Sequence, residues 1–241
     1  MLRKMPMSER IDTVLARSQT RNHCDFCDEF AGGTNNAFHA LYHDALRTRV
    51  LLATNTFRVF PTIGQLVDGY LMIAPVSHYT AMDQIPAEAV VELVDLSELI
   101  RTVLSKLYGS SVFFEHGARS PINGGCGVYH AHLHAMPLHG LADPVETLKQ
   151  RFSYIELSDL HEVTKQSARL PSYLFYQDSN ARLYLFDTGP LPSQYMRILF
   201  ASSLGEENWN WREVGREERL LSTVERLSGR FDTTCNTVRP R

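Results

Sequence analysis

Three histidines that alternate with apolar residues say more about chemistry than any other stretch of this sequence. They are His130, His132 and His134, separated by Ala131 and Leu133. In a strand, side chains two residues apart share a face at a spacing of roughly 6.5–7 Å. We therefore expect the imidazoles on one face and the apolar residues in a core. Such a row can bind a metal or place a nucleophile between groups that hold an anion. A solvent-facing strand with chance histidines is the alternative.

The motif extends over residues 130–136 and at every position resembles the signature of the histidine triad (HIT) family of nucleotide hydrolases and transferases. The resemblance implies that His132 attacks the α-phosphorus of a nucleotide. A nucleotidyl-histidine intermediate would form, and water or another acceptor would resolve it. His134 and His130 would hold the phosphate or stabilise the charge that develops. The spacing alone does not separate the three roles.

A second motif near the start of the chain has the spacing of a metal site. Cys24 and Cys27 are separated by two residues, which lets both thiolates reach one zinc ion in a tight turn. The resemblance to zinc-containing HIT proteins adds His78 and His130 as ligands. Four protein ligands leave no position for a catalytic water, so this Zn²⁺ would be structural. A redox pair and an unligated turn remain alternatives, although no thioredoxin-like strand and helix frame the pair.

The segment before the triad is predicted to bind substrate through Glu115, Gly125, Cys126 and Gly127. Glycines in the loop of residues 118–127 let backbone amides approach an anion closely. The best-known HIT branch has an asparagine at the position of Glu115 and a Gln-Ser pair at Cys126 and Gly127. Without that serine hydroxyl, and with a carboxylate that would repel phosphate unless it binds ribose or a cation, we expect a substrate other than simple adenosine phosphoramidates. Cys126 is either a nucleophile or, more simply, a small neutral filler.

Two further groups of candidate residues have both a binding and a structural interpretation. Phe57 and Phe60 lie in a region that the resemblance makes one wall of the nucleoside pocket, or they belong to ordinary sheet core. Arg197 lies where a strand leads into a helix, and a helix N-terminus can meet phosphate there. A capped helix with a solvated arginine is the alternative. His116 and His139 are expected to be structural.

Hydrophobic patterning predicts the elements that position these residues. Strands are expected at 50–54, 57–60, 70–74 and 112–114, with a hairpin of 173–176 and 182–186. Helices are expected at 8–18, 86–108, 158–169 and 217–227, with shorter ones after residues 143 and 192. The predicted fold class is α+β, a HIT-like antiparallel sheet flanked by helices. Residues 1–140 form the core, and residues 141–241 form an α+β extension packed on it, in a single domain overall.

Composition and charge exclude some classes of function. The chain has 241 residues, of which 44% are hydrophobic, enough for one large core. Its formal net charge of −3 argues against sequence-independent binding to long nucleic acid. No apolar run is long enough to span a membrane, and the first residues lack the apolar stretch of a secretory signal. A cytoplasmic location is therefore expected, and the resemblance suggests a homodimer.

The sequence thus predicts a nucleotidyl hydrolase that works through His132. Transfer of the nucleotidyl group to phosphate or a sugar phosphate would use the same intermediate and is the close alternative. A nucleotide-binding module without turnover is the third interpretation, because the Gln-Ser pair is replaced.

Overall fold

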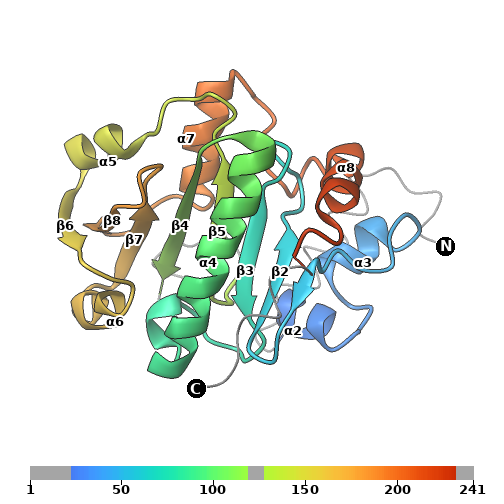
Figure 1. The fold of residues 1–241 in the computed structure, drawn as a ribbon, viewed down its shortest axis with the longest axis horizontal. Coiled ribbons are helices and arrows are strands. Elements are labelled where there is room, and N and C mark those ends of the chain that lie inside the picture. Colours follow the sequence, from blue (N-terminus) through green and yellow to red (C-terminus); the bar gives the residue numbers. More distant parts are fainter. Residues whose placement is uncertain (1–22, 119–127, 232–241) are drawn as a thin grey trace.

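Strands from both halves of the chain form one antiparallel sheet. The computed structural model describes residues 23–118 and 128–231. In these ranges the sheet has eight strands in the order β1-β2-β3-β5-β4-β7-β8-β6 (Figure 1). The strands are β1 (Leu52–Ala53), β2 (Phe57–Pro61), β3 (Leu71–Pro75), β4 (Ser111–Ala118), β5 (Leu133–Pro137), β6 (Ser153–Leu157), β7 (Ser172–Gln177) and β8 (Leu183–Asp187). The predicted α+β fold class is confirmed.

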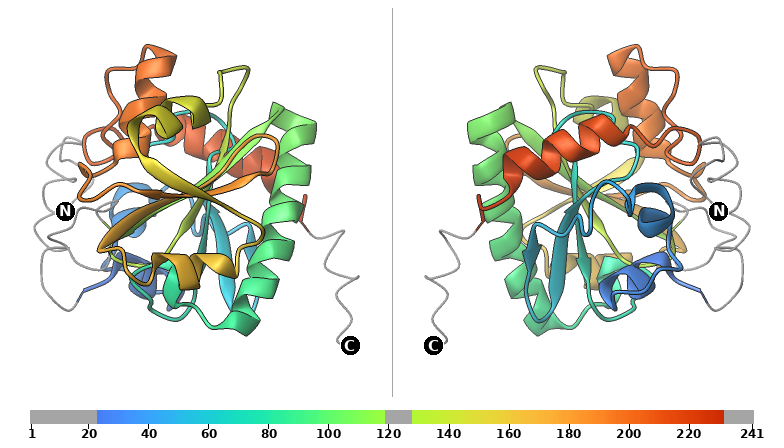
Figure 2. Two further views of the ribbon diagram at one scale, coloured as in Figure 1. Left: turned by 90° about the vertical axis from the view of Figure 1, so that its left-hand side faces the viewer. Right: turned by 90° about the vertical axis from the view of Figure 1, so that its right-hand side faces the viewer.

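Helices cover both faces of this sheet. They are α2 (Asp25–Phe30), α3 (Ala37–Tyr42), α4 (Ala87–Tyr108), α5 (Val145–Arg151), α6 (Glu162–Ser167), α7 (Tyr195–Leu204) and α8 (Glu217–Leu227), with a 3₁₀ turn η2 (Met82–Gln84). Seen along the sheet, α4 lies on one side, and α2, α3 and α7 lie on the other (Figure 2). No helix in the described ranges is long and apolar enough to cross a bilayer. The helix predicted at residues 8–18 lies outside the described residues.

Alternating side chains divide the interior into two main cores. Ile73, Leu133 and Phe113 lie in the core that packs against α4. Phe114 and Met136 lie in the core on the opposite face, against α5 and α7. Each fully buried side chain of this size contributes about 1.5–3 kcal/mol through removal of apolar surface from water. The two cores therefore fix which face of each strand looks toward which helices.

The extension continues the sheet that carries the triad. β4 pairs with β5 on one side and with β7 on the other, and the β4–β7 ladder joins six residue pairs. β8 and β6 then follow β7 outward. The boundary predicted at residue 140 remains a prediction, but the sheet runs across it without a break.

The triad strand is shorter than predicted. β5 begins at Leu133, so His130 and His132 lie in the segment just before the strand. Inside the strand, His134 pairs with Met72 of β3 and with Phe114 of β4. The predicted strand at residues 50–54 is also reduced, to the two residues of β1. The central strands position His134 directly, whereas His130 and His132 need other support.

Candidate functional site

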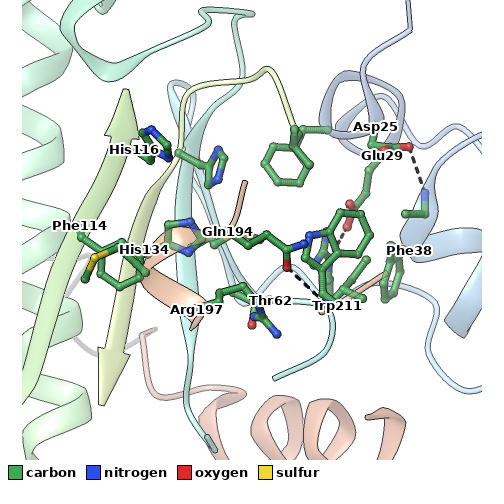
Figure 3. Close-up of a pocket in the computed structure, with 18 of the residues that line it drawn as sticks. Asp25, Glu29, Phe38, Thr62, Phe114, His116, His134, Gln194, Arg197 and Trp211 are labelled. Carbon is green, nitrogen blue, oxygen red and sulfur yellow. Dashed lines mark hydrogen bonds and ion pairs between the residues drawn. The ribbon is translucent and has the colours of Figure 1, made fainter. Parts of the chain in front are cut away.

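One cavity brings the triad together with the N-terminal helices and the C-terminal extension. The empty space of this cavity, together with the solvent-filled space at its mouth, is about 710 Å³. The residues that line it include His116, His132, His134, Phe26, Phe38, Ile63, Gln194, Arg197 and Trp211. Figure 3 shows His116 and His134 at one end, Phe38 and Trp211 at the other, and Gln194 between them. The cavity thus has an imidazole end and an aromatic end.

His132 is held as a neutral imidazole in one tautomer. Its Nδ1 lies 2.5 Å from the carbonyl oxygen of His130. A carbonyl only accepts hydrogen bonds, so Nδ1 carries the proton and Nε2 keeps its lone pair. Burial lowers the pKa of His132 below its ordinary value, since the charged form is poorly solvated. No described residue hydrogen-bonds to Nε2, so this nitrogen can act as a nucleophile toward a group in the cavity.

The ring of His134 is fixed by aromatic neighbours. It stacks on Phe114 with 4.7 Å between ring centroids, and the Tyr70 hydroxyl lies 3.0 Å from its Nδ1. Its centroid is 4.8 Å from that of His132. Burial, and then the charges of His132 and Arg197, hold the pKa of His134 well below its ordinary value. His134 is therefore a second neutral imidazole beside His132.

His130 is not among the residues that line the cavity, and the catalytic role predicted for it stays a prediction. Its Nε2 lies 2.7 Å from the Pro75 carbonyl oxygen, and its Nδ1 lies 3.3 Å from Cys24 Sγ and 3.5 Å from Cys27 Sγ. Both nitrogens are thus directed at protein partners. The physical reason is that the chain enters the sheet only at Leu133, so His130 need not share the face of His134. Of its two predicted roles, the geometry favours metal ligation.

Four ligand atoms converge where the sequence predicts the metal site. One atom each from Cys24, Cys27, His78 and His130 lie within 4.8 Å of one another, and Cys27 Sγ is 3.3 Å from His78 Nδ1. Zinc bonds of about 2.3 Å to sulfur and about 2.0 Å to nitrogen put these ligands roughly 3.5 Å apart in a tetrahedron. Because the Pro75 carbonyl accepts a hydrogen bond from Nε2–H of His130, Nδ1 keeps its lone pair and is available to a metal, as metal-binding histidines require. These four residues could hold a metal ion.

The thiol chemistry argues against the redox alternative. Burial raises the pKa of Cys24 to about 12, whereas redox cysteines have lowered pKa values and stay exposed enough to react. A buried thiol of this kind loses its proton only beside a strong positive charge, which a bound cation supplies. The four residues therefore fit a metal site better than a redox pair.

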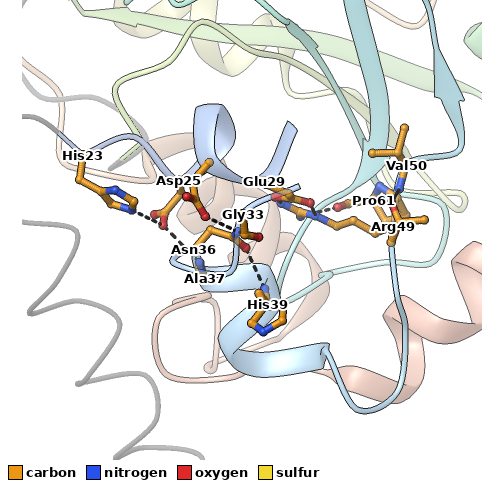
Figure 4. Close-up of polar contacts among 12 residues, drawn as sticks. His23, Asp25, Glu29, Gly33, Asn36, Ala37, His39, Arg49, Val50 and Pro61 are labelled. Atoms are coloured by element: carbon orange, nitrogen blue, oxygen red, sulfur yellow. Dashed lines mark hydrogen bonds and ion pairs between the residues drawn. The ribbon is translucent and has the colours of Figure 1, made fainter. Parts of the chain in front are cut away.

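The cluster of four candidate metal ligands holds α2 over the triad. Phe26, between the two cysteines, packs edge-on against His132 with 5.6 Å between centroids. A second anchor is the buried ion pair in which Arg49 donates to both carboxylate oxygens of Glu29 and to the Pro61 carbonyl (Figure 4). The N-terminal segment thus forms one wall of the cavity.

Glu115, predicted to bind substrate, is not among the residues that line this cavity. Successive residues of a strand point to opposite faces, and Phe114 and His116 occupy the cavity side of β4. The Glu115 carboxylate instead accepts hydrogen bonds from the Met82 amide at 2.6 Å and the Tyr173 hydroxyl at 2.8 Å. Burial raises its pKa to about 8. The structure makes Glu115 a neutral core residue at moderate pH.

The predicted aromatic contacts are replaced by others. Phe57 is completely buried in the core beneath α4. Phe60 lies behind Phe26, and their ring centroids are 5.2 Å apart. Phe26, Phe38 and Trp211 line the cavity instead. No periodic pattern marks Phe38 or Trp211, because both reach the site from a short helix or a loop. The predicted contacts of Gly125, Cys126 and Gly127 lie outside the described residues.

Arg197 lines the cavity as a buried side chain, so the alternative of a solvated arginine is wrong. Its guanidinium donates to the Gly64 carbonyl at 2.5 Å and to the Trp209 carbonyl at 2.9 and 3.1 Å. It therefore ties α7 to two loops while it places a positive charge beside the imidazole end. His139, by contrast, is exposed; its Nε2 lies 2.9 Å from the Asp68 carbonyl oxygen and its ring lies beside that of Tyr108.

His116 is the residue that sequence reasoning missed. It was expected to be structural, yet it lines the cavity and is only 8% exposed. The signal was its position in the strand: His116 is two residues after Phe114 and shares its face of β4, and Phe114 pairs with His134. That signal becomes readable only when the register of β4 against β5 is known.

Comparisons with known proteins add a likeness in fold. No family model and no curated protein matches the chain. Its structure is similar to a HIT family protein from Bacillus subtilis, with 18% identity and a TM-score of 0.38 over 49% of this chain and 75% of that one. A zinc-bound histidine triad protein from Mycobacterium smegmatis has 19% identity and a TM-score of 0.35, over 47% of this chain and 73% of that one. A DUF4931 family protein from Bacillus cereus has 9% identity and a TM-score of 0.43, over 73% of this chain and 98% of that one.

Metal analysis tests the cluster. We expect the purified protein to carry about one metal ion per chain, and Cys27→Ser to lower both the metal content and the melting temperature because a ligand is lost. The exposed His43 provides a matched control in His43→Ala, which should keep the metal. A wild-type protein that stays metal-free after reconstitution, or a Cys27→Ser protein that keeps a full equivalent, would contradict the site.

Glu115→Gln tests the buried carboxyl through the pH dependence of stability. Between the ordinary pKa of about 4.5 and the folded value of about 8, the folded state keeps a proton that the unfolded state has lost. Wild-type stability should therefore fall as pH rises through this window, by an amount of the order of a few kcal/mol. Glutamine does not titrate and removes this contribution. The free energy of unfolding of the variant, measured with urea, should therefore rise relative to that of the wild type between pH 5 and pH 8. The exposed Glu156→Gln is the control, and a constant difference at all pH values would refute the argument.

Proposed function

We propose that this protein is a nucleotidyl hydrolase in which His132 attacks the α-phosphorus of a nucleotide derivative. One observation carries the proposal: a buried imidazole that lines the cavity, whose Nδ1–H is bonded to the His130 carbonyl and whose Nε2 therefore keeps its lone pair. An exposed histidine would exchange its tautomers and spend part of its time protonated. Here the protein itself maintains the nucleophilic form.

The reaction proceeds in two displacements. The Nε2 lone pair forms a bond to phosphorus, and the bond to the leaving group breaks, so that the leaving group departs with the electron pair. The imidazole gains positive charge in this step, and the His130 carbonyl stabilises that charge through the Nδ1–H bond. Water then attacks phosphorus, the P–N bond breaks, and a nucleoside monophosphate leaves. A proton is released to solvent, and neutral His132 is restored.

The two ends of the cavity match the two ends of a nucleotide. His134 and the positive Arg197 stand at the end where phosphate would lie. Phe38 and Trp211 provide apolar, planar surfaces for a base at the other end, and Phe26 lies beside His132. The Glu29 carboxylate also lines the cavity, but its charge is compensated by Arg49.

The proposed metal is Zn²⁺ in a structural role. Two thiolates and two imidazoles are a donor set that zinc prefers, and all four tetrahedral positions would be filled by protein. The ion would hold Cys24 and Cys27 of the N-terminal segment against His130. It would therefore position the backbone carbonyl of His130, to which His132 bonds.

Substrate screening tests the proposal. Wild type and His132→Ala are incubated with nucleoside phosphoramidates, dinucleoside polyphosphates and nucleotide sugars, with and without phosphate, and the products are separated by chromatography. We expect a nucleoside monophosphate from the wild type and a loss of about 10⁴-fold or more in kcat for the variant, as for removal of a covalent nucleophile.

The exposed His43→Ala serves as the control and should keep wild-type turnover. A nucleoside diphosphate that forms only with phosphate would make the enzyme a phosphorylase, which uses the same intermediate with another acceptor. Turnover that survives in His132→Ala would exclude His132 as the nucleophile. Tight nucleotide binding without any turnover would leave a binding module.

A further inference from the structure

His116 lies near the proposed nucleophile. In the ladder of β4 and β5, Ser111 pairs with Pro137 and Phe114 pairs with His134, where the ladder ends. His116 follows Phe114 by two residues on the same face of β4, and His132 precedes His134 by two residues in the segment just before β5. Both side chains line the cavity. His116 is not one of the three histidines of the triad.

One nitrogen of His116 is held by the protein, and the other has no protein partner among the described residues. Nε2 lies 3.4 Å from the hydroxyl oxygen of Ser172, which is completely buried on β7. Nδ1 is buried and has no hydrogen-bond partner among the described residues. A buried polar atom without a partner costs about 1–3 kcal/mol. A ligand in the cavity that pairs with Nδ1 would remove this penalty.

The tautomer of His116 decides what kind of ligand group it can meet. A serine hydroxyl can donate to Nε2, and then Nδ1 carries the only proton of the ring. Burial lowers the pKa of His116 to about 4, so the ring stays neutral at physiological pH. A neutral N–H donor at this position suits an anionic oxygen, whereas the opposite tautomer would present a lone pair and repel it.

We propose that His116 is a phosphate-binding residue of this site, whose Nδ1–H donates to a non-bridging oxygen of the phosphoryl group that His132 attacks. Ser172 fixes the tautomer by donating to Nε2. This inference rests on the proposed function and extends it, because it adds a fourth histidine to the imidazole end. His134 and His116 then contact the phosphoryl group from two adjacent strands.

A pair of variants separates the two nitrogens of the ring. Asparagine places its amide nitrogen near the position of Nδ1, whereas glutamine reaches the position of Nε2. We expect His116→Asn to stay close to the wild type and His116→Gln to lose about 10- to 100-fold in kcat/KM, as for a lost hydrogen bond to a charged group. The Kd for nucleoside monophosphates, measured by calorimetry, should rise in parallel. Melting temperatures of both variants check that the fold is retained.

A structural role for His116 predicts the reverse order. If its bond to Ser172 were what mattered, His116→Gln would keep function and stability, and His116→Asn would lose both. Nitrogen NMR of the ligand-free protein provides an independent readout, with the Nδ1–H tautomer expected in the wild type and a mixture in Ser172→Ala. A wild-type Nε2–H tautomer, or equal binding by all variants, would overturn the inference. A wild type that neither binds nor converts nucleotides would instead refute the proposed function, and this inference with it.

Discussion

Buried imidazoles must be neutral, and each needs a partner for its N–H group; this constraint organises the whole site. His130 bonds to the Pro75 carbonyl, His132 bonds to the His130 carbonyl, and His134 lies beside the Tyr70 hydroxyl. The two bonds to carbonyl oxygens fix the tautomers of His130 and His132 and thereby decide what the other nitrogen of each ring can do. The His130 bond leaves a nitrogen for a metal, and the His132 bond leaves one for the cavity. Burial lowers the pKa of all three groups, so none of them carries a charge that the interior could not solvate.

His130 links the candidate metal ligands to the proposed nucleophile, His132. Its side chain belongs to the cluster of Cys24, Cys27 and His78, while its carbonyl accepts the Nδ1–H of His132. The two sites are therefore coupled through one residue, and a structural ion would act on catalysis by holding that carbonyl in place. The same cluster keeps α2 against the triad, which excludes water from one side of the cavity. Cys24 and Cys27, which are far from the triad in the sequence, thus help to position His132, the proposed nucleophile.

Local patterns predicted the elements well but not the faces of all strands. The 22-residue helix α4 and the β7–β8 hairpin follow from periodicity, and the metal ligands follow from spacing and resemblance. The roles of Glu115 and His116 could not be predicted, because they depend on a register that only the pairing of β4 with β5 sets. Trp211 was missed for another reason, since it reaches the cavity from a loop of the extension and no local pattern marks it.

The most direct test of the central claim is the mass of the intact protein when turnover is stopped at alkaline pH, where a bond between phosphorus and an imidazole nitrogen survives. The account predicts a fraction of the protein heavier by one nucleotidyl group, with the added mass on the peptide that contains His132 and lost on brief acid treatment. An enzyme that turns over while its mass never changes, or that carries the group on another residue, would contradict the claim that His132 is the nucleophile.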